Sequence, residues 1–261
     1  MKLSASNIAW DSNDDEFMYC KLNELGFDGL EIAPTRIFPN NPYDKLDEAK
    51  AFQTMLKSKF SLEISSMQSI WYGRNENIFN SAEERNVLLD YTRKAIEFAE
   101  VLECRNLVFG CPRNRTGGSQ YPEIAKAFFY ELGEYAHTHN TVLAMEANPA
   151  IYNTDYINFT NQAIDLVKDV NSEGFKLNLD VGTMIENEED ISILKDNIDI
   201  INHVHISEPY LNQIQERKSH NTLGSYLKIG AYDRFVSLEM KNLGDINQVE
   251  KILSYMKNTF I

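Results

Sequence analysis

The sequence predicts a single domain, residues 1–261, folded as an α/β barrel of eight strand–helix units. Short apolar segments alternate with amphipathic segments along the whole chain, which predicts parallel strands joined by right-handed helical crossovers. The length of 261 residues and the apolar content of 43% suit such a barrel, which commonly needs about 250 residues. No GxGxxG or GxxxxGK motif follows any strand, which argues against the competing open, doubly wound sheet.

Eight short segments with apolar or alternating character predict the strands. The first is KLSASNIAW near the N-terminus, and the second lies within GFDGLEIAP, where a glycine-containing turn precedes a short apolar run. The eight strand segments are 2–10, 26–34, 62–68, 105–110, 141–146, 175–180, 201–205 and 235–239.

Amphipathic segments between these strands predict eight helices. The first helix should stop at Gly26, because glycine commonly follows a helix C-terminus. The segment near 188–196 is acidic and makes a poor helix. The eight helical segments are 17–25, 45–60, 82–102, 122–139, 158–170, 188–196, 222–229 and 246–257.

The net charge, the cysteine content and the absence of long apolar runs argue against several classes of binding partner. The net charge of −14 argues against nucleic acid, since binding to phosphates depends on clustered Lys and Arg. Three cysteines without a CxxC pair suggest reduced thiols rather than disulfides or structural zinc. The N-terminus has no apolar signal region and no run of 18 apolar residues occurs, so we expect a cytoplasmic protein without a membrane partner. The oligomeric state stays open, and a homo-oligomer is compatible with the sequence.

Four consecutive strands in the second half of the chain each end on a side chain that binds divalent metals. These are Glu146, Asp180, His205 and Glu239, spaced 34, 25 and 34 residues apart. That spacing is about one strand–helix unit, so each side chain should lie at the C-terminal end of its own strand. Three carboxylates and one imidazole suit one Mn²⁺, Mg²⁺, Co²⁺ or Zn²⁺ ion. The sequence therefore predicts a single-metal site at the mouth of the barrel.

Strand alternation supports this prediction. Residues two apart face the same way, so Asn178 shares the face of Asp180 and His203 shares that of His205, while the intervening residues are apolar. His203 should lie one level deeper and orient its neighbours. A buried charge costs several kcal/mol unless it is paired or bound to metal, whereas a single Glu, Asp or His at a strand end has ordinary structural explanations. The metal hypothesis depends on the four residues together.

Five motifs make the chain resemble the xylose isomerase-like superfamily, which includes D-tagatose/D-psicose 3-epimerases, inosose dehydratases, hydroxypyruvate isomerases and deoxyribonuclease IV-type endonucleases. They are GFDGLEI at 26–32, AMEANP at 144–149, LNLDVGT at 177–183, HVHISEP at 203–209 and YLKIGAYDRFVSLEM at 226–240. The resemblance implies that Glu146 and Glu239 bind the metal and act as acid and base, and that Asp180 and His205 complete the coordination. It further implies that Glu208 and Arg217 support the site or contact substrate hydroxyls.

The chain departs from the superfamily at Thr183, where many relatives have histidine. It also has only five histidines, too few in the right places for the three-metal cluster of the endonucleases. An endonuclease acting on abasic DNA is therefore disfavoured.

The expected chemistry is proton transfer beside a carbonyl. A divalent ion that binds a carbonyl and its neighbouring hydroxyl acidifies the adjacent C–H, and Glu146 and Glu239 can then remove and return the proton through an enediolate. The sequence predicts a metal-dependent isomerase or epimerase acting on a sugar or sugar phosphate. An inosose-type dehydratase using the same site, or a non-catalytic sugar-binding barrel, are the alternatives. The exact substrate and the metal are not determined.

Loops after the strands are expected to supply further substrate contacts. Trp71 is expected either to stack on a sugar or to cover the barrel rim, and Glu31 either to accept a substrate hydroxyl or to pair with a helix charge. The loop PRNRTGGSQ holds Arg113 and Arg115 before a helix. It is expected either to grip a phosphate or to form a flexible surface lid.

Overall fold

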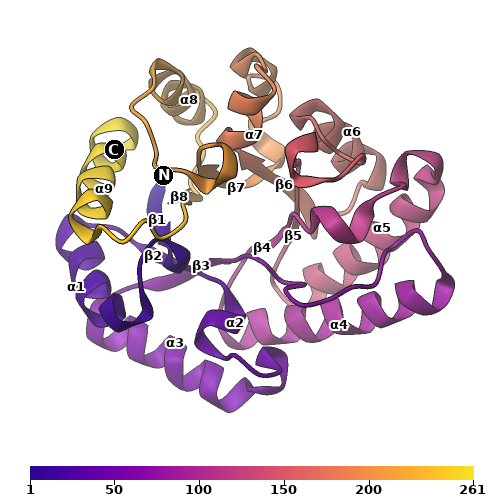
Figure 1. Ribbon diagram of the computed structural model, residues 1–261, viewed down its shortest axis with the longest axis horizontal. Helices are drawn as coiled ribbons and strands as arrows, with labels where there is room; N and C mark the ends of the chain where they lie inside the picture. The colour runs from indigo at the N-terminus through magenta and orange to yellow at the C-terminus, as the bar shows by residue number, and fades with distance from the viewer.

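The computed structural model describes all 261 residues and shows a closed barrel of eight parallel strands in chain order, with β1 pairing to β8. The predicted single-domain (β/α)8 fold is confirmed (Figure 1). The strands are β1 Lys2–Ser6, β2 Gly29–Ile32, β3 Glu63–Met67, β4 Leu107–Phe109, β5 Leu143–Glu146, β6 Phe175–Asp180, β7 Ile201–Ile206 and β8 Phe235–Leu238.

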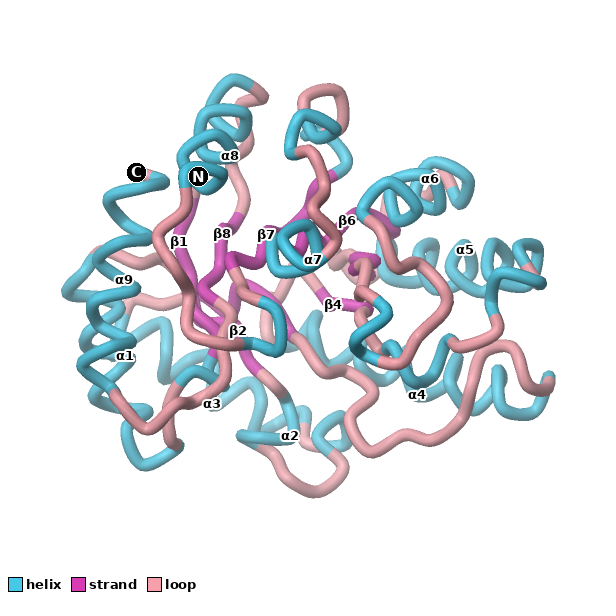
Figure 2. The backbone as a smooth tube through the Cα atoms, turned by 45° about the horizontal axis from the view of Figure 1, so that its top comes forward, coloured by secondary structure: helices cyan, strands magenta, loops and turns pink.

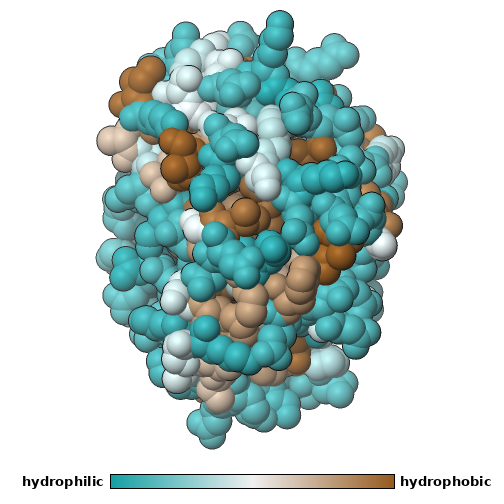
Figure 3. All heavy atoms as spheres, turned by 90° about the vertical axis from the view of Figure 1, so that its left-hand side faces the viewer, coloured by the Kyte–Doolittle hydropathy of each residue, from teal (hydrophilic) through white to brown (hydrophobic).

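Helices enclose this barrel on the outside (Figure 2). They are α1 Asp15–Leu25, α2 Pro34–Ile37, α3 Leu46–Phe60, α4 Ala82–Val101, α5 Pro122–Thr138, α6 Thr160–Val170, α7 Val181–Glu186, α8 Lys218–Ile229 and α9 Ile246–Phe260. Gly26 ends α1 in the left-handed conformation with φ of 76°, as its sequence position predicts. The face that carries α1, α8 and α9 is mostly hydrophilic, with apolar groups in several separate places (Figure 3).

Several predicted boundaries are wrong, and one short helix was missed. The first strand stops at Ser6, where a 3-10 turn over Asn7–Ala9 begins. The helix expected near 188–196 lies earlier, as α7, because the carboxylate of Asp180 accepts the backbone N–H groups of Gly182 and Thr183 and starts a helix at once. Only a 3-10 turn occupies Ile191–Leu194. The short helix α2 had no counterpart in the sequence prediction.

Side chains separate across the strands as the alternation predicts. Leu177, Leu179 and Val204 belong to one apolar core of 67 buried residues, whereas Asn178 and His203 are buried among polar groups of the barrel interior. The strands therefore direct apolar groups toward the helices and polar groups toward the axis. This division brings the polar residues of β5 to β8 together at one end of the barrel.

Candidate metal centre

The four predicted metal ligands converge at the C-terminal end of the barrel. Glu146 and Asp180 are the last residues of β5 and β6, His205 is the last but one of β7, and Glu239 directly follows β8. One potential ligand atom from each lies within 4.8 Å of the others. Glu146, His205 and Glu239 are buried, and Asp180 is half-buried. We call these four residues the acidic cluster.

His205 lies at the centre of the acidic cluster and is fully buried. Its Nδ1 is 3.0 Å from Oε1 of Glu146 and 3.2 Å from Oε2 of Glu239, and its Nε2 is 2.8 Å from Oε2 of Glu31. Burial alone would lower the pKa of His205, but the charges of Glu239 and Glu31 and the hydrogen bonds to Glu146 and Glu239 outweigh it and raise the pKa well above its usual value. The imidazole thus joins carboxylates on both of its sides.

Asp180 is held by its own helix and by the next strand. Its carboxylate accepts hydrogen bonds from the backbone N–H of Thr183 at 2.8 Å and from the Ser207 hydroxyl. The Thr183 hydroxyl lies 2.7 Å from the same carboxylate and 2.8 Å from the carbonyl of Ala147. Removal from water and repulsion by Glu146 raise the pKa of Asp180. Thr183 therefore supports Asp180.

Glu146 is fixed by two amide groups. Asn178 donates to its Oε1 at 2.7 Å, and Asn148 donates to its Oε2 at 3.1 Å. A methyl group on Gly110 would lie 2.9 Å from Oε2 of Glu146, so the glycine that follows β4 leaves room for this carboxylate. The strand alternation placed Asn178 on the right face, but the sequence offered no signal for Gly110.

Glu239 is held less tightly. Its carboxylate approaches His205, but no amide donates a hydrogen bond to it. Burial, followed by repulsion from Glu31 and Asp180, raises the pKa of Glu239. The two glutamates of the acidic cluster therefore differ in how firmly they are positioned.

The acidic cluster fits a hard or borderline divalent cation. The cluster contains three carboxylates and one imidazole. Glu146 and Glu239 both contact that imidazole, and no lysine or arginine forms an ion pair with any carboxylate of the cluster. Such an excess of buried negative charge is costly unless a cation neutralises it. Carboxylate oxygens and an imidazole nitrogen are ligands that Mn²⁺, Co²⁺ and Zn²⁺ share.

Glu208 and Arg217 form an ion pair with each other. Nε and Nη2 of Arg217 lie 2.7 and 2.6 Å from the two carboxylate oxygens of Glu208, and the backbone N–H of Gln215 donates to the same carboxylate. Glu208 is buried, while about a third of the Arg217 side chain is exposed. The pair lies outside the acidic cluster.

Trp71 and Glu31, which were predicted to contact substrate, are both buried. Trp71 is buried, packs edge-on against Phe109 with ring centroids 4.7 Å apart, and donates its indole N–H to Thr92 at 2.8 Å. It therefore belongs to the core rather than to the barrel rim. Glu31 lies against His203 and His205 rather than pairing with a helix charge.

The loop that holds Arg113 and Arg115 does not offer two free guanidinium groups. Arg113 is exposed. Arg115 is fully buried and donates to the backbone carbonyl of Glu146 and to the side chain of Asn148, both at 2.9 Å. Arg115 therefore supports the chain segment that carries Glu146, and its guanidinium group is not exposed to solvent.

Tyr152 is a neighbour of the acidic cluster that the sequence did not reveal. Its hydroxyl oxygen accepts the backbone N–H of Tyr210 at 2.8 Å. Burial, and then the negative charges of Asp180, Glu239 and Glu146, raise the pKa of Tyr152 to about 12. The phenol therefore lies close to the acidic cluster and stays neutral.

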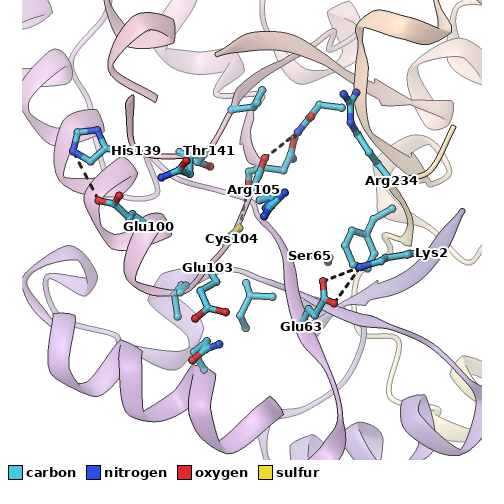
Figure 4. Close-up of a pocket in the computed structure, with 18 of the residues that line it drawn as sticks. Lys2, Glu63, Ser65, Glu100, Glu103, Cys104, Arg105, His139, Thr141 and Arg234 are labelled. Carbon is cyan, nitrogen blue, oxygen red and sulfur yellow. Dashed lines mark hydrogen bonds and ion pairs between the residues drawn. The ribbon is translucent and has the colours of Figure 1, made fainter. Parts of the chain in front are cut away.

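A cavity lies at the opposite end of the barrel, near the N-terminal ends of the strands. It has a volume of about 1030 Å³ and is lined mostly by polar side chains, among them Lys2, Glu63 and Arg105 (Figure 4). None of the acidic cluster lines it. The chemistry of the side chains, rather than the size of the cavity, therefore marks the candidate site.

Comparison with known proteins agrees with this architecture. A family model described as xylose isomerase-like TIM barrel matches residues 21–258, and no curated protein matches by sequence. No helix has the length and apolar character needed to cross a membrane.

Solved structures with this fold cover nearly the whole chain. D-psicose 3-epimerase from Clostridium cellulolyticum H10, solved with D-tagatose, is 15% identical with a TM-score of 0.79 and coverage of 100% of this chain and 99% of that one. The 3-keto-D-glucoside 4-epimerase from E. coli is 19% identical, with a TM-score of 0.76 and 99% coverage of both chains. The IOLI protein with a bound zinc atom is 17% identical, with a TM-score of 0.73 and coverage of 99% and 96%.

Proposed function

The chain belongs to the xylose isomerase-like TIM barrel family, and from this premise we propose that it is a divalent-metal-dependent isomerase or epimerase of a sugar or sugar phosphate. The reaction moves a proton beside a carbonyl through an enediolate. One observation carries the proposal. Glu146 and Glu239, from β5 and the end of β8, both approach Nδ1 of the same buried histidine, so two carboxylates from different strands border one small volume.

Glu146, Asp180, His205 and Glu239 would hold the metal. When bound, a divalent ion polarises a carbonyl and stabilises the negative charge that develops on its oxygen. The names of the similar structures support this proposal, because two are epimerases of keto sugars and one contains zinc.

The two glutamates would transfer the proton. Glu146 is held by Asn178 and Asn148, so it presents a fixed oxygen for the carbon acid. Glu239 has fewer restraints and can approach the substrate from its own strand. Removal by one carboxylate and return by the other to the opposite face gives epimerisation, return to the neighbouring carbon gives isomerisation, and loss of a β-hydroxyl gives dehydration.

Deuterium exchange tests this proposal. Metal-loaded protein is incubated in D₂O with a panel of ketoses, their phosphates and keto-inositols, and deuterium is followed at the carbon beside the carbonyl. At least one compound should exchange, and Glu146→Gln and Glu239→Gln should each slow exchange by on the order of 10² or more. Glu63→Gln, an exposed glutamate at the other end of the barrel, should leave the rate unchanged.

Two outcomes would remove the enediolate mechanism. The first is a panel without exchange above a metal-only control. The second is exchange that persists in both active-site variants. Either outcome would favour a sugar-binding protein without catalysis.

We also propose that the protein does not process DNA, because its net charge is −14 and affinity for duplexes depends on a cationic surface. Purified protein should leave a duplex with an abasic site intact. Nicking that disappears in Glu239→Gln would overturn this proposal.

A further inference from the structure

Glu31 lies directly behind the metal-facing histidine. It is fully buried in β2, and its Oε2 is 2.8 Å from Nε2 of His205 and 3.2 Å from Nε2 of His203. Its Oε1 lies 3.2 Å from the side-chain amide of Gln68, which also donates to Ser6 at 2.5 Å. Both oxygens of Glu31 thus face donors, and none of the hydrogen bonds of this carboxylate reaches the open end of the barrel.

The two nitrogens of His205 face different groups. Nδ1 points toward Glu146 and Glu239, and Nε2 points toward Glu31. A histidine can bind a metal only through a nitrogen without a proton, so ligation through Nδ1 requires the proton to remain on Nε2. Glu31 is the acceptor placed to hold that proton.

We propose that Glu31 and His203 are positioning residues that hold His205 in the Nε2–H form and aim its Nδ1 at the metal. This inference rests on the proposed function, because it assigns the support of the same metal site. A carboxylate behind a metal-binding histidine fixes the ring orientation and makes it a stronger ligand, and loss of such a partner typically weakens metal binding 10- to 100-fold.

His203 contributes by holding Glu31. It lies two residues before His205 on the same face of β7, and the two rings meet edge-on with centroids 5.2 Å apart. Glu31 is the only charged group within ion-pair distance of His203, at 3.2 Å from Nε2, and neither ring nitrogen of His203 makes a hydrogen bond. The His203 ring lies against Oε2 and confines the carboxylate from one side, while the hydrogen bond from Gln68 restrains it from the other.

Glu31, His203 and His205 also lie close enough together to hold a second ion. That arrangement would require His205 to bind a metal on both nitrogens and so to lose both protons. The hydrogen-bonded arrangement needs no such loss and leaves both oxygens of Glu31 satisfied. Metal stoichiometry separates the two possibilities, since positioning requires one ion per chain.

The test measures metal binding without any sugar. Zn²⁺ affinity is determined by competition with a chelator for the wild type, Glu31→Gln, His203→Leu, His203→Gln and the control Glu63→Gln, and bound metal per chain is counted. We expect one ion per chain in the wild type and a 10- to 100-fold weaker affinity in Glu31→Gln. The loss should be smaller in His203→Leu and smaller still in His203→Gln, whose polar side chain can still face Oε2 of Glu31, and Glu63→Gln should be unchanged.

A second readout does not depend on variants that fold. In ¹⁵N-histidine-labelled, Zn²⁺-loaded wild type, His205 should show a protonated Nε2 and a metal-bound Nδ1. The proposal is overturned by a protonated Nδ1, by unchanged affinity in Glu31→Gln, or by two ions per chain of which Glu31→Gln removes one.

The metal-affinity and deuterium-exchange experiments distinguish failure of the positioning role from failure of the proposed function. A protein that exchanges no deuterium in any sugar but loses Zn²⁺ affinity in Glu31→Gln keeps the positioning role and loses the isomerase proposal. Exchange that depends on Glu146 and Glu239, with Glu31→Gln matching the wild type in metal affinity, gives the reverse result.

Discussion

The acidic residues at the two ends of the barrel differ in their exposure and in their ion-pair partners. At the N-terminal end, Glu63 pairs with Lys2 and Glu103 pairs with Lys57 at 3.1 and 3.3 Å, and all of these side chains are about half exposed. At the C-terminal end, the acidic cluster is largely buried, and its three carboxylates have one histidine and no lysine or arginine beside them. Exposed pairs of the first kind contribute little to stability, whereas buried uncompensated charge is costly. The acidic cluster at the C-terminal end should therefore destabilise the fold, as expected of residues kept for function.

The largest effect on folding should come from removing Arg115 beneath the C-terminal end. Arg115→Met leaves the carbonyl of Glu146 and the side chain of Asn148 without their donor. Unfilled buried acceptors cost about 1–3 kcal/mol each, so chemical denaturation should show a loss of about 2–4 kcal/mol. Arg113→Met, a matched change at an exposed position of the same loop, should stay within about 0.5 kcal/mol. Equal losses in the two variants would show that the buried arginine is not a support.

A pH-dependent loss of stability should arise at His220, near the start of α8. Burial lowers its pKa to about 4, and its Nδ1 is paired with the hydroxyl of Tyr255 at 2.9 Å. The unfolded chain, with a histidine pKa near 6.5, binds this proton first. The stability is therefore fully present above about pH 6.5 and is lost as the pH falls toward 4.

The contribution of His220 is measured as a difference between two proteins. The wild type should lose on the order of 2 kcal/mol more than His220→Gln between pH 7 and pH 4.5, since one pKa unit corresponds to about 1.4 kcal/mol. Urea unfolding of both at several pH values gives this difference directly. Parallel stability curves for the two proteins would contradict it.

The smallest effect should come from the N-terminal end. Glu63→Gln removes an ion pair whose partners are 41% and 55% exposed, so its free energy of unfolding should change by about 0–1 kcal/mol. High salt should reduce even this change. A loss comparable to that of Arg115→Met would remove the contrast between the two ends.

The fold and the acidic cluster were predictable because both follow from two regular features of the sequence: the two-residue alternation along each strand and the spacing between successive strand ends. Alternation along β6 and β7 places Asn178 and His203 on the axis side, and the spacing of the strand ends places Asp180 and His205 side by side in the register of the sheet. These relations depend only on the strand repeat and on the length of one strand–helix unit.

The supporting residues were not predictable in the same way. Arg115 and Trp71 lie in segments that connect a strand to the next long helix, where no regular alternation predicts which way a side chain points. Both side chains are buried instead of facing the mouth of the barrel. Glu31 lies on a strand, but its role depends on a contact with His205, 174 residues away. Gly110 acts through space that a side chain would fill. Contacts of this kind join residues far apart in the sequence, so they can be identified only from the three-dimensional structure.

Metal binding at the acidic cluster tests the central claim most directly. Metal content and Zn²⁺ or Mn²⁺ affinity are compared for the wild type, Asp180→Asn and the control Asp233→Asn, which changes an exposed aspartate at the N-terminal cavity. Asparagine keeps an oxygen to cap α7, so the fold should survive. We predict one ion per chain in the wild type and in the control, with affinity at least about 10-fold weaker in Asp180→Asn. A wild type that binds no ion in stoichiometric amount, or an Asp180→Asn variant with wild-type affinity, would contradict a metal centre at this end of the barrel.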